Sequence, residues 1–210
     1  MKIINQDNWK RKEYFDFFKG TTNPRIGVTV EMDITNGYQF CKDHKKSLHH
    51  FYHYNAHKAM HSVEELTYRI KGEDVVVYDE LDIVTVLLHE NKTFKLARCE
   101  FSEEFETFSN NANKQFDKAL KQKTMGMEVL TPNHDYVLYS TVPKLKFIGL
   151  RFSLFDPQVT FPKVAFGKFY KDGNKVLMPF HIEVHHGLAD GYHVGVYLEN
   201  YQKMLDQTTF

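Results

Sequence analysis

The stretch FHIEVHHGLADGYHVGVYL, residues 180–198, joins a strand pattern to a helical pattern and decides the fold. Side chains alternate between the two faces of a strand. One predicted face is apolar and ends in a histidine, with Phe180, Ile182, Val184 and His186. The other predicted face is polar, with His181, Glu183 and His185. The alternation therefore sends His186 inward with the apolar side chains, where its imidazole can be dehydrated and oriented.

The residues after His186 are typical of an amphipathic helix. Asp190 lies where a helix N-cap belongs, and its carboxylate can accept hydrogen bonds from the first backbone N–H groups. Apolar side chains follow at helical spacing: Val194, Tyr197, Leu198, Tyr201 and Leu205. The H-x-x-x-D-G spacing thus joins a candidate general base to an acid that can fix a turn. A core histidine with satisfied hydrogen bonds is the alternative interpretation of His186.

Helical and strand patterns alternate through the rest of the chain. Helices are predicted at residues 8–19, 40–66 and 102–123, besides the one after Asp190. Strands are predicted at residues 26–34, 75–78, 83–89, 93–97, 136–141 and 145–152. A hairpin is predicted to run over 164–170, turn at Asp172-Gly173 and return over 176–186. The pattern predicts an α/β protein of the α+β type, in which helices pack against a mixed β-sheet.

Composition limits the class of protein. A chain of 210 residues with 42% hydrophobic content can bury one core, so we expect a single domain over residues 1–210. Lys plus Arg and Asp plus Glu both number 27, which gives no net positive field for nucleic acid. No apolar leader or 18-residue apolar run occurs, so we expect a cytoplasmic protein without membrane contact. Cys41 and Cys99 are too few for a disulfide framework or a zinc knuckle.

Several short motifs, in order along the whole chain, resemble the chloramphenicol acetyltransferase family. They include NWKRKEYF at 8–15, EMDIT at 31–35, RIKG at 69–72, GKF at 167–169, VLMP at 176–179 and HGLADGYH at 186–193. H-x-x-x-D-G also occurs in dihydrolipoyl and carnitine acyltransferases, so the ordered set is more specific than that motif alone. The resemblance implies a two-layer sandwich of the CoA-dependent acyltransferase type, and a homotrimer with sites between subunits. It also implies acetyl-CoA as co-substrate, with no permanently bound cofactor, and O-acetylation of chloramphenicol.

Acyl transfer from a thioester to a hydroxyl needs a base for the hydroxyl proton and a donor to the oxyanion. The resemblance implies His186 as the base, facing the neighbouring subunit's pocket, and Ser140 as the oxyanion donor. An ordinary imidazole, with a pKa of about 6.5, is a competent base at neutral pH. The resemblance also implies that Asp190 pairs with Arg11 and holds the turn, rather than acting chemically. An ordinary strand serine is the alternative for Ser140.

The resemblance assigns further residues to the two substrates. Along the coenzyme A path it implies Tyr52, Lys168 and Phe169, with a lysine for phosphate and an aromatic for stacking. Around the acceptor it implies Phe17, Thr85 and Phe94. Four acceptor positions depart from the family pattern: Phe18 replaces a tyrosine, Met127 a phenylalanine, Lys144 a tryptophan and Ala165 a water-ordering threonine. The acceptor therefore stays open, with another small hydroxyl or thiol compound as the alternative to chloramphenicol.

A row of histidines offers a competing interpretation. His49, His53, His57 and His61 fall four apart on a predicted helix and could chelate zinc or nickel in pairs. The chain has no HExxH element, and a histidine row on one helix is typical of an exposed face. We therefore expect no resident metal. A non-catalytic ligand- or metal-binding protein on the same fold is the alternative from another functional class.

Overall fold

The computed structural model describes residues 1–153, 156 and 159–208. Within these residues a mixed sheet has the strand order β2-β10-β8-β7-β5-β6, and β9 pairs with β10. The strands are β2 (Arg25–Asp33), β5 (Asp82–Leu88), β6 (Phe94–Cys99), β7 (Tyr136–Thr141), β8 (Lys163–Phe166), β9 (Tyr170–Asp172) and β10 (Lys175–His185). Strand β7 is parallel to both β5 and β8, whereas β10 is antiparallel to β2, β8 and β9. The prediction of a mixed sheet is confirmed.

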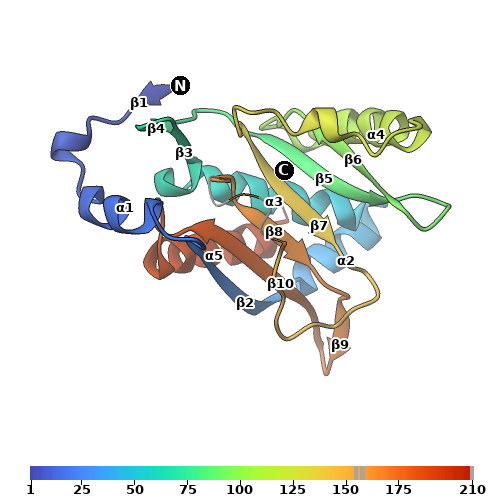
Figure 1. Cartoon of the computed structure of the whole chain (residues 1–210). Helices are drawn as coiled ribbons and strands as arrows, with labels where there is room; N and C mark the ends of the chain where they lie inside the picture. Colours follow the sequence, from blue (N-terminus) through green and yellow to red (C-terminus); the bar gives the residue numbers. More distant parts are fainter. Residues whose placement is uncertain (154–155, 157–158, 209–210) are drawn as a thin grey trace.

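Helices form a second layer behind this sheet, as Figure 1 shows. They are α2 (Thr35–Asp43), α3 (Leu48–His61) and α5 (Gly191–Asp206), with α4 (Phe105–Lys121) against β6. Helix α1 (Lys12–Lys19) lies at the far left, near a small sheet of β1 (Lys2–Ile3), β4 (Asp74–Val77) and β3 (Tyr68–Lys71). Short 3-10 turns are η1 (Gln6–Asn8), η2 (Glu64–Thr67) and η3 (Met127–Val129). The two-layer sandwich is confirmed.

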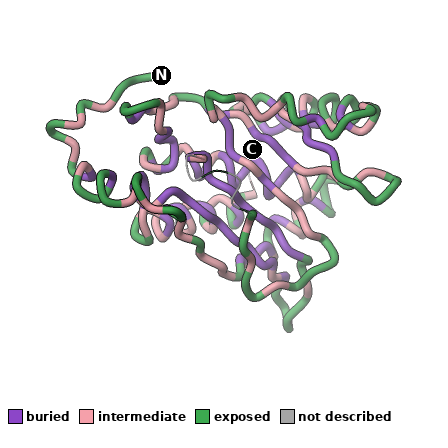
Figure 2. Tube along the Cα trace, viewed as in Figure 1, coloured by how far each residue is buried: buried purple, intermediate pink, exposed green. Residues whose placement is uncertain are grey.

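The core lies between the sheet and the helices, where the central strands of Figure 2 are buried. The inward side chains of β10 pack there against the apolar stripe of α5: Phe180, Ile182, Val184, Val194, Tyr197, Tyr201 and Leu205. Each fully buried apolar side chain of this size contributes about 1.5–3 kcal/mol. This packing fixes the direction of β10 and α5, and with them the turn that joins the two elements.

Some predicted elements differ from the structure. The region predicted as one helix, 40–66, divides into α2 and α3, because the Ser47 side chain accepts from the His50 N–H and caps a new helix. The first helix begins at Lys12 rather than at residue 8. The predicted strand at 145–152 is wrong: these residues form no strand, and Leu145 and Ile148 are 58% and 95% exposed. The hairpin at Asp172-Gly173 is confirmed, although β8 and β9 are separate strands.

Candidate active site

His186 lies in the turn between β10 and α5, one residue beyond the end of the strand. Its backbone N–H donates to the carbonyl of Pro24 over 2.6 Å, and its side chain is half-buried. The expectation that His186 belongs to the buried apolar face of the strand is therefore wrong. Both faces of β10 are covered, because His181, Glu183 and His185 are also buried. The turn moves His186 out of that layer and leaves its side chain partly open to solvent.

An aromatic ring holds the imidazole of His186 on one side. Phe18 of α1 stacks on it, with ring centroids 4.1 Å apart and planes inclined by 19°. Nδ1 is enclosed and has no hydrogen-bond partner among the described residues. Nε2 is not enclosed in this way, and no described residue hydrogen-bonds to it. Nε2 is thus the ring nitrogen that can meet a substrate hydroxyl.

Arg11 connects the N-terminal segment to the turn that carries His186. One guanidinium nitrogen lies 2.7 Å from Oδ2 of Asp190, and another donates to the backbone carbonyl of His186 over 3.1 Å. Arg11 is buried, and the side chain of Asp190 is 31% exposed. The predicted Arg11–Asp190 pair is therefore present. Arg11 contacts the turn at its start, His186, and at its end, Asp190.

Asp190 also caps α5, as its position in the sequence predicts. Its Oδ1 accepts from the backbone N–H of Tyr192 over 3.0 Å and lies 2.8 Å from Nδ1 of His193. Partial burial alone would raise the pKa of this carboxyl, but the hydrogen bond from Arg11 and the nearby His193 lower it to about 2. The carboxylate is thus ionised at neutral pH. Its bonds go to Arg11 and to the start of α5 rather than to the His186 imidazole.

Ser140 lies on β7, on the face of the sheet that points away from α3. Its register neighbours are Val86 on β5 and Ala165 on β8, and Ala165 pairs in turn with His181 on β10. The Ser140 side chain is half-buried. Paired residues point to the same side of a sheet. Ser140, Ala165 and His181 therefore form a row across three strands.

The register also separates Ser140 from His186 within one chain. His186 lies five positions beyond His181 along β10, and Ser140 lies two strands away from it. A rise of about 3.3 Å per residue and a strand spacing of about 4.8 Å place the two residues about 15–20 Å apart. A small reacting group cannot contact both side chains across this distance. The structure does not bring the predicted base and the predicted oxyanion donor of one chain together.

The residues assigned to coenzyme A lie near the end of β7 and β8 that follows Ser140. Tyr52 of α3 is buried, and its hydroxyl lies 3.4 Å from Oγ1 of Thr141. Burial raises the pKa of Tyr52 to about 12, so the phenol stays protonated. Lys168 and Phe169 follow β8 and are exposed, and the Phe169 ring lies 5.7 Å from that of Tyr38. An exposed lysine and an exposed aromatic ring thus neighbour each other beside the Ser140 end of the sheet.

The structure divides the residues assigned to the acceptor among three places. Phe17 lies beside Phe18 on α1 and is 70% exposed. Phe94 on β6 and Met127 in η3 are 48% and 53% exposed at the edge of the sheet. Thr85 faces α3 and bonds His53, because it pairs with Tyr139 and so points away from the Ser140 face. Thr85, which the resemblance assigns to the acceptor, is thus buried on the α3 side of the sheet, opposite the side that carries Ser140.

The sequence profile described as Chloramphenicol acetyltransferase matches residues 1–202. The chain belongs to the chloramphenicol acetyltransferase family. It is 31% identical to a chloramphenicol acetyltransferase of Campylobacter coli over 97% of this chain and 98% of the relative. It is 24% identical to chloramphenicol acetyltransferase 3 of Escherichia coli over 94% of this chain and 93% of the relative.

Solved structures agree with this membership. A chloramphenicol acetyltransferase superposes with a TM-score of 0.90 at 27% identity, covering 98% of this chain and 100% of that one. A probable dihydrolipoamide acetyltransferase from Listeria monocytogenes has a TM-score of 0.67 at 12% identity, which shows a shared fold alone. The predicted CoA-dependent acyltransferase fold is confirmed.

The histidine row of this chloramphenicol acetyltransferase family member does not form the exposed face that its spacing suggested. His53 and His57 are 2% and 0% exposed, since α3 is enclosed by the sheet and by its neighbouring helices. Within the described part of the chain, no three His, Cys, Asp or Glu side chains are grouped so that they could hold a metal ion. Burial lowers the pKa of His57 to about 3 and that of His49 to about 4. His53 and His57 are thus uncharged members of the core, whereas His49 and His61, at the two ends of the row, are half-buried.

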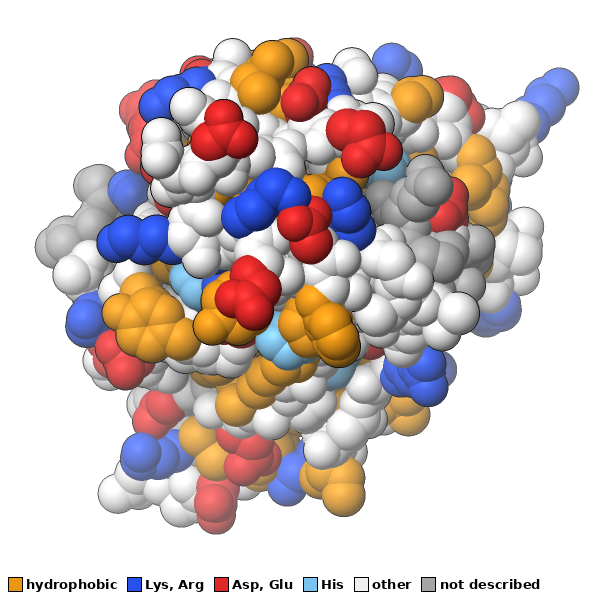
Figure 3. All heavy atoms as spheres, turned by 60° about the vertical axis from the view of Figure 1, so that its left-hand side comes forward, with side chains coloured by type: hydrophobic (Ala, Val, Ile, Leu, Met, Phe, Trp, Pro, Cys, Tyr) orange, Lys and Arg blue, Asp and Glu red, His pale blue; other side chains and the backbone are white. Residues whose placement is uncertain are grey.

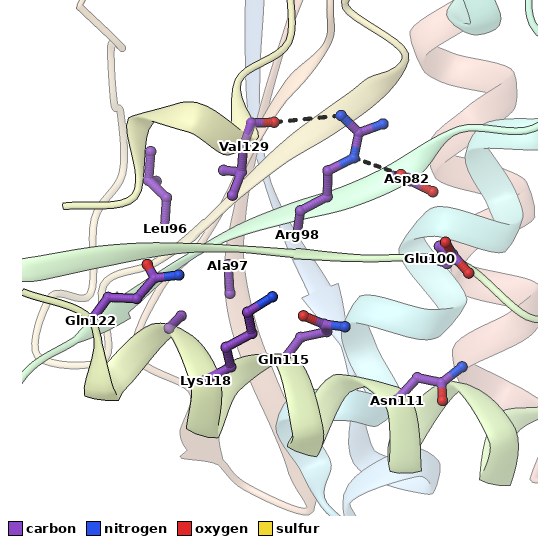
Figure 4. A pocket seen from close by; sticks show the side chains of 11 residues that line it. Asp82, Leu96, Ala97, Arg98, Glu100, Asn111, Gln115, Lys118, Gln122 and Val129 are labelled. Atoms are coloured by element: carbon purple, nitrogen blue, oxygen red, sulfur yellow. Dashed lines mark hydrogen bonds and ion pairs between the residues drawn. The ribbon is translucent and has the colours of Figure 1, made fainter. Parts of the chain in front are cut away.

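The two largest clefts within the described part of the chain lie away from His186 and Ser140. A polar cleft of about 380 Å³ between α4 and β6 is lined by Asn111, Gln115 and Lys118 of α4, by Gln122 just after it, and by Arg98 of β6, whose guanidinium turns toward Asp82 and Val129 (Figure 4). A second cleft, of about 600 Å³, is lined by parts of α3 and α4 and by the end of α5. Neither cleft includes His186 or Ser140.

None of the described helices is both long and apolar enough to cross a membrane.

Sequence reasoning missed two contacts that shape the His186 turn. The backbone carbonyl of Pro24 accepts a hydrogen bond from the N–H of His186, and Phe18 stacks on the imidazole of His186. The first could have been found from the pairing of β2 with β10, because Pro24 precedes the residue opposite His185. The second depends on how α1 lies against the turn, which no local pattern specifies.

Proposed function

We propose that this protein transfers the acetyl group of acetyl-CoA directly to a hydroxyl group of chloramphenicol, with His186 as the general base. The observation that carries the proposal is the His186 turn: Nδ1 is enclosed, Nε2 is open, and Arg11 and Asp190 hold the backbone. This turn occurs in a chain that matches the family over residues 1–202. Since acetyl-CoA is a co-substrate made inside the cell, the reaction belongs in the cytoplasm.

The residues support a reaction without a covalent enzyme intermediate. Nε2 of His186 takes the proton of the acceptor hydroxyl, whose oxygen attacks the thioester carbonyl carbon. The carbonyl oxygen becomes an oxyanion, and the hydroxyl of Ser140 donates a hydrogen bond to it. The tetrahedral intermediate then expels the coenzyme A thiolate, which takes the proton back from the imidazolium. The base is restored, and the products are the acetyl ester and free coenzyme A.

We further propose that each site forms between two subunits of a homotrimer. His186 and Ser140 of one chain are about 15–20 Å apart, so one site needs His186 from one chain and Ser140 from another. Apolar side chains are exposed around the His186 turn. On α1 and at the start of α5, Tyr14, Phe17 and Tyr192 are 55%, 70% and 76% exposed, and hydrophobic side chains lie beside histidine on the face in Figure 3. Exposed aromatic surface of this kind favours contact with another subunit.

For coenzyme A, the exposed Lys168 and Phe169 suit a phosphate group and the adenine ring. Tyr52 lies deeper, on the α3 side of the same strand ends. For the acceptor, another small hydroxyl compound is the second candidate. The observation that favours it is the pair of residues nearest the reacting groups, because Ala165 beside Ser140 and Phe18 beside His186 both lack a hydroxyl. Loss of a pocket hydrogen bond costs about 1–3 kcal/mol.

Thiol release from acetyl-CoA in the presence of chloramphenicol tests the activity, and a panel of other hydroxyl compounds tests the acceptor. His186→Ala should lower kcat by several orders of magnitude and leave acetyl-CoA binding intact. A variant that keeps more than about a tenth of the rate contradicts a general-base role, which contributes about 10²–10⁴-fold.

A mixing experiment tests the site between subunits. His186→Ala and Ser140→Ala chains should each be inactive or weak alone, and unfolding and refolding them together should give mixed oligomers. Some interfaces then hold an intact His186 opposite an intact Ser140, so activity should return well above the sum of the two variants. No recovery in mixed oligomers of confirmed composition would contradict a shared site.

A further inference from the structure

Ser140 is flanked by two residues that face the opposite side of the sheet. Tyr139 and Thr141 alternate with Ser140 along β7, so their side chains point toward α3. Tyr139 is 0% exposed, and its ring stacks on Phe166 of β8 with planes inclined by 5°. The orientation of the Ser140 side chain therefore depends on how the residues on either side of it are held.

Side chains of helix α3 form hydrogen bonds with both Tyr139 and Thr141. Nδ1 of His57 lies 3.1 Å from the hydroxyl of Tyr139, and the hydroxyl of Tyr52 lies 3.4 Å from Oγ1 of Thr141. The two α3 residues are five positions apart, and the two β7 residues are two positions apart. The helix thus contacts the strand on each side of Ser140, through polar groups in an otherwise apolar core.

The hydrogen bonds of His57 leave one tautomer. Nε2 lies 2.7 Å from the backbone carbonyl of Leu81, which can only accept, so Nε2 carries the proton. Nδ1 is then an acceptor, and the Tyr139 hydroxyl donates to it. Nε2 of His61, 3.3 Å from Nε2 of His57, faces the same N–H as an acceptor. Leu81 directly precedes β5, which pairs with β7 at Val86 and Ser140.

Both members of the His57–Tyr139 bond are neutral near pH 7. Burial lowers the pKa of His57 to about 3 and raises the pKa of Tyr139 well above its usual value. His57 is also 0% exposed. The bond is therefore not exchanged with water or altered by titration in the range where the enzyme would work.

We propose that His57 is a positioning residue for Ser140: by accepting from Tyr139 and donating to Leu81, it fixes β7 against β5 so that the Ser140 hydroxyl is aimed at the oxyanion. This inference rests on the proposed function of Ser140. His57 itself lies on the other side of the sheet and is fully buried, so it offers no surface to a substrate. If His57 only stabilised the core, its replacement would lower the free energy of unfolding but would not specifically slow the step in which Ser140 donates to the oxyanion.

Tyr139→Phe tests the proposal, because it removes one oxygen and keeps the stacked ring. Its matched control is Tyr197→Phe, since Tyr197 is also 0% exposed and its hydroxyl has no hydrogen-bond partner among the described residues. We expect Tyr139→Phe to lower kcat about tenfold with little change in KM for either substrate, and Tyr197→Phe to leave kcat unchanged. Thermal unfolding of each variant verifies that it is folded at the assay temperature.

Coupling to Ser140 separates positioning from general stability. In a Ser140→Ala background, where no hydroxyl remains to be aimed, Tyr139→Phe should lower kcat less than about twofold further. The same tenfold loss in both backgrounds, an unchanged kcat for Tyr139→Phe, or an equal loss in Tyr197→Phe would overturn the proposal. If Ser140→Ala itself keeps the full rate, the proposed role of Ser140 is contradicted. If Ser140→Ala is slow but Tyr139→Phe is not, only the positioning role of His57 is contradicted.

Two conservative variants of His57 provide a second readout. His57→Asn places an amide near the position of Nδ1 and can still accept from Tyr139, whereas His57→Gln reaches toward Leu81 and loses the Tyr139 bond. Positioning through Tyr139 predicts that His57→Asn keeps the larger share of kcat. A larger share in His57→Gln would overturn the assignment of the Tyr139 bond, whatever the stabilities of the two variants.

Discussion

The ring of Phe18 stacks on the imidazole of His186, with centroids 4.1 Å apart and planes inclined by 19°. The stacked ring restricts rotation of the imidazole. No hydrogen bond does so at Nδ1, which is enclosed and has no partner among the described residues. The backbone of His186 is held separately, by Pro24 and Arg11. The direction of Nε2 thus depends on a packed ring rather than on a hydrogen bond from the side chain.

Replacing Phe18 by Ala should therefore lower kcat by about tenfold or more and leave KM for acetyl-CoA nearly unchanged. An imidazole without its stacking partner samples other rotamers, and misplacement of a reacting group is costly to the rate. Steady-state kinetics check this, and unfolding measurements should show a loss of at least about 0.5–1.5 kcal/mol, the contribution of one aromatic pair beyond the burial of its apolar area. Full kcat in a folded Phe18→Ala variant would show that the backbone contacts alone orient His186.

The Arg11–Asp190 pair predicts coupled stability effects. Arg11→Ala and Asp190→Ala should each lower the free energy of unfolding, and the double variant should lose less than the sum, with a coupling of about 0.5 kcal/mol or more. Asp190→Asn separates two roles, because its amide oxygen still accepts from the Tyr192 N–H but carries no charge for Arg11. Urea unfolding of the four proteins measures the coupling. Strict additivity would mean that the pair contributes nothing beyond the cap.

The elements around the H-x-x-x-D-G motif were predictable because their signals are local. The hairpin needed a turn residue, and Gly173 has φ +57°. The cap of α5 needed a short acceptor before an apolar helical stripe, and Asp190 provides it. The segment 145–152 misled because Leu145 and Ile148 are apolar yet exposed. An alternating pattern reports which side chains avoid water, and it does not say whether a second subunit or the chain's own core covers them.

The sequence predicts which residues belong to the site, but not how they are arranged in space. Whether Thr85 and Ser140 share a face depends on the register of β5 against β7, which pairs Thr85 with Tyr139. A shift of one residue would reverse the result. The separation of His186 from Ser140 likewise follows from the register, because the row that holds Ser140 and Ala165 meets β10 at His181, five residues before His186. These are relations between distant segments, and the amino-acid sequence of one chain does not display them.

The buried histidines predict acid lability. Burial lowers the pKa of His57 to about 3 and that of His185 to about 4, from an ordinary 6.5. At these two residues the unfolded chain takes up protons below about pH 6.5 and the folded chain does not, so their contribution to the free energy of unfolding should fall as pH drops toward 4. Each such histidine contributes a slope of about 1.4 kcal/mol per pH unit in that window. Above pH 7 both forms are neutral and this contribution vanishes.

Urea unfolding between pH 4.5 and 8 measures this dependence. His185→Gln removes one titrating group, so its slope below pH 6.5 should be shallower than that of the wild type, whatever its stability at pH 8. His44→Gln is the control, because it makes the same substitution at a histidine whose side chain is exposed. A wild-type stability that is flat from pH 8 to 5 would contradict the buried neutral state of these rings.

The last prediction concerns the acceptor. Ala165 pairs with Ser140 across the β7–β8 ladder and is 0% exposed. The sequence resemblance implies a threonine at this position in the family. Chloramphenicol should therefore be acetylated with a lower kcat/KM than by the Campylobacter coli relative. Ala165→Thr should recover part of this efficiency without changing KM for acetyl-CoA, because it returns a hydroxyl beside the reacting group. Ala165→Val is the matched control, since it adds nearly the same volume without the hydroxyl and shares any overpacking cost of about 1–3 kcal/mol. Equal effects of Thr and Val would show that volume rather than hydrogen bonding at this position governs the acceptor, and a wild type as efficient as the relative would show that the changed positions are tolerated.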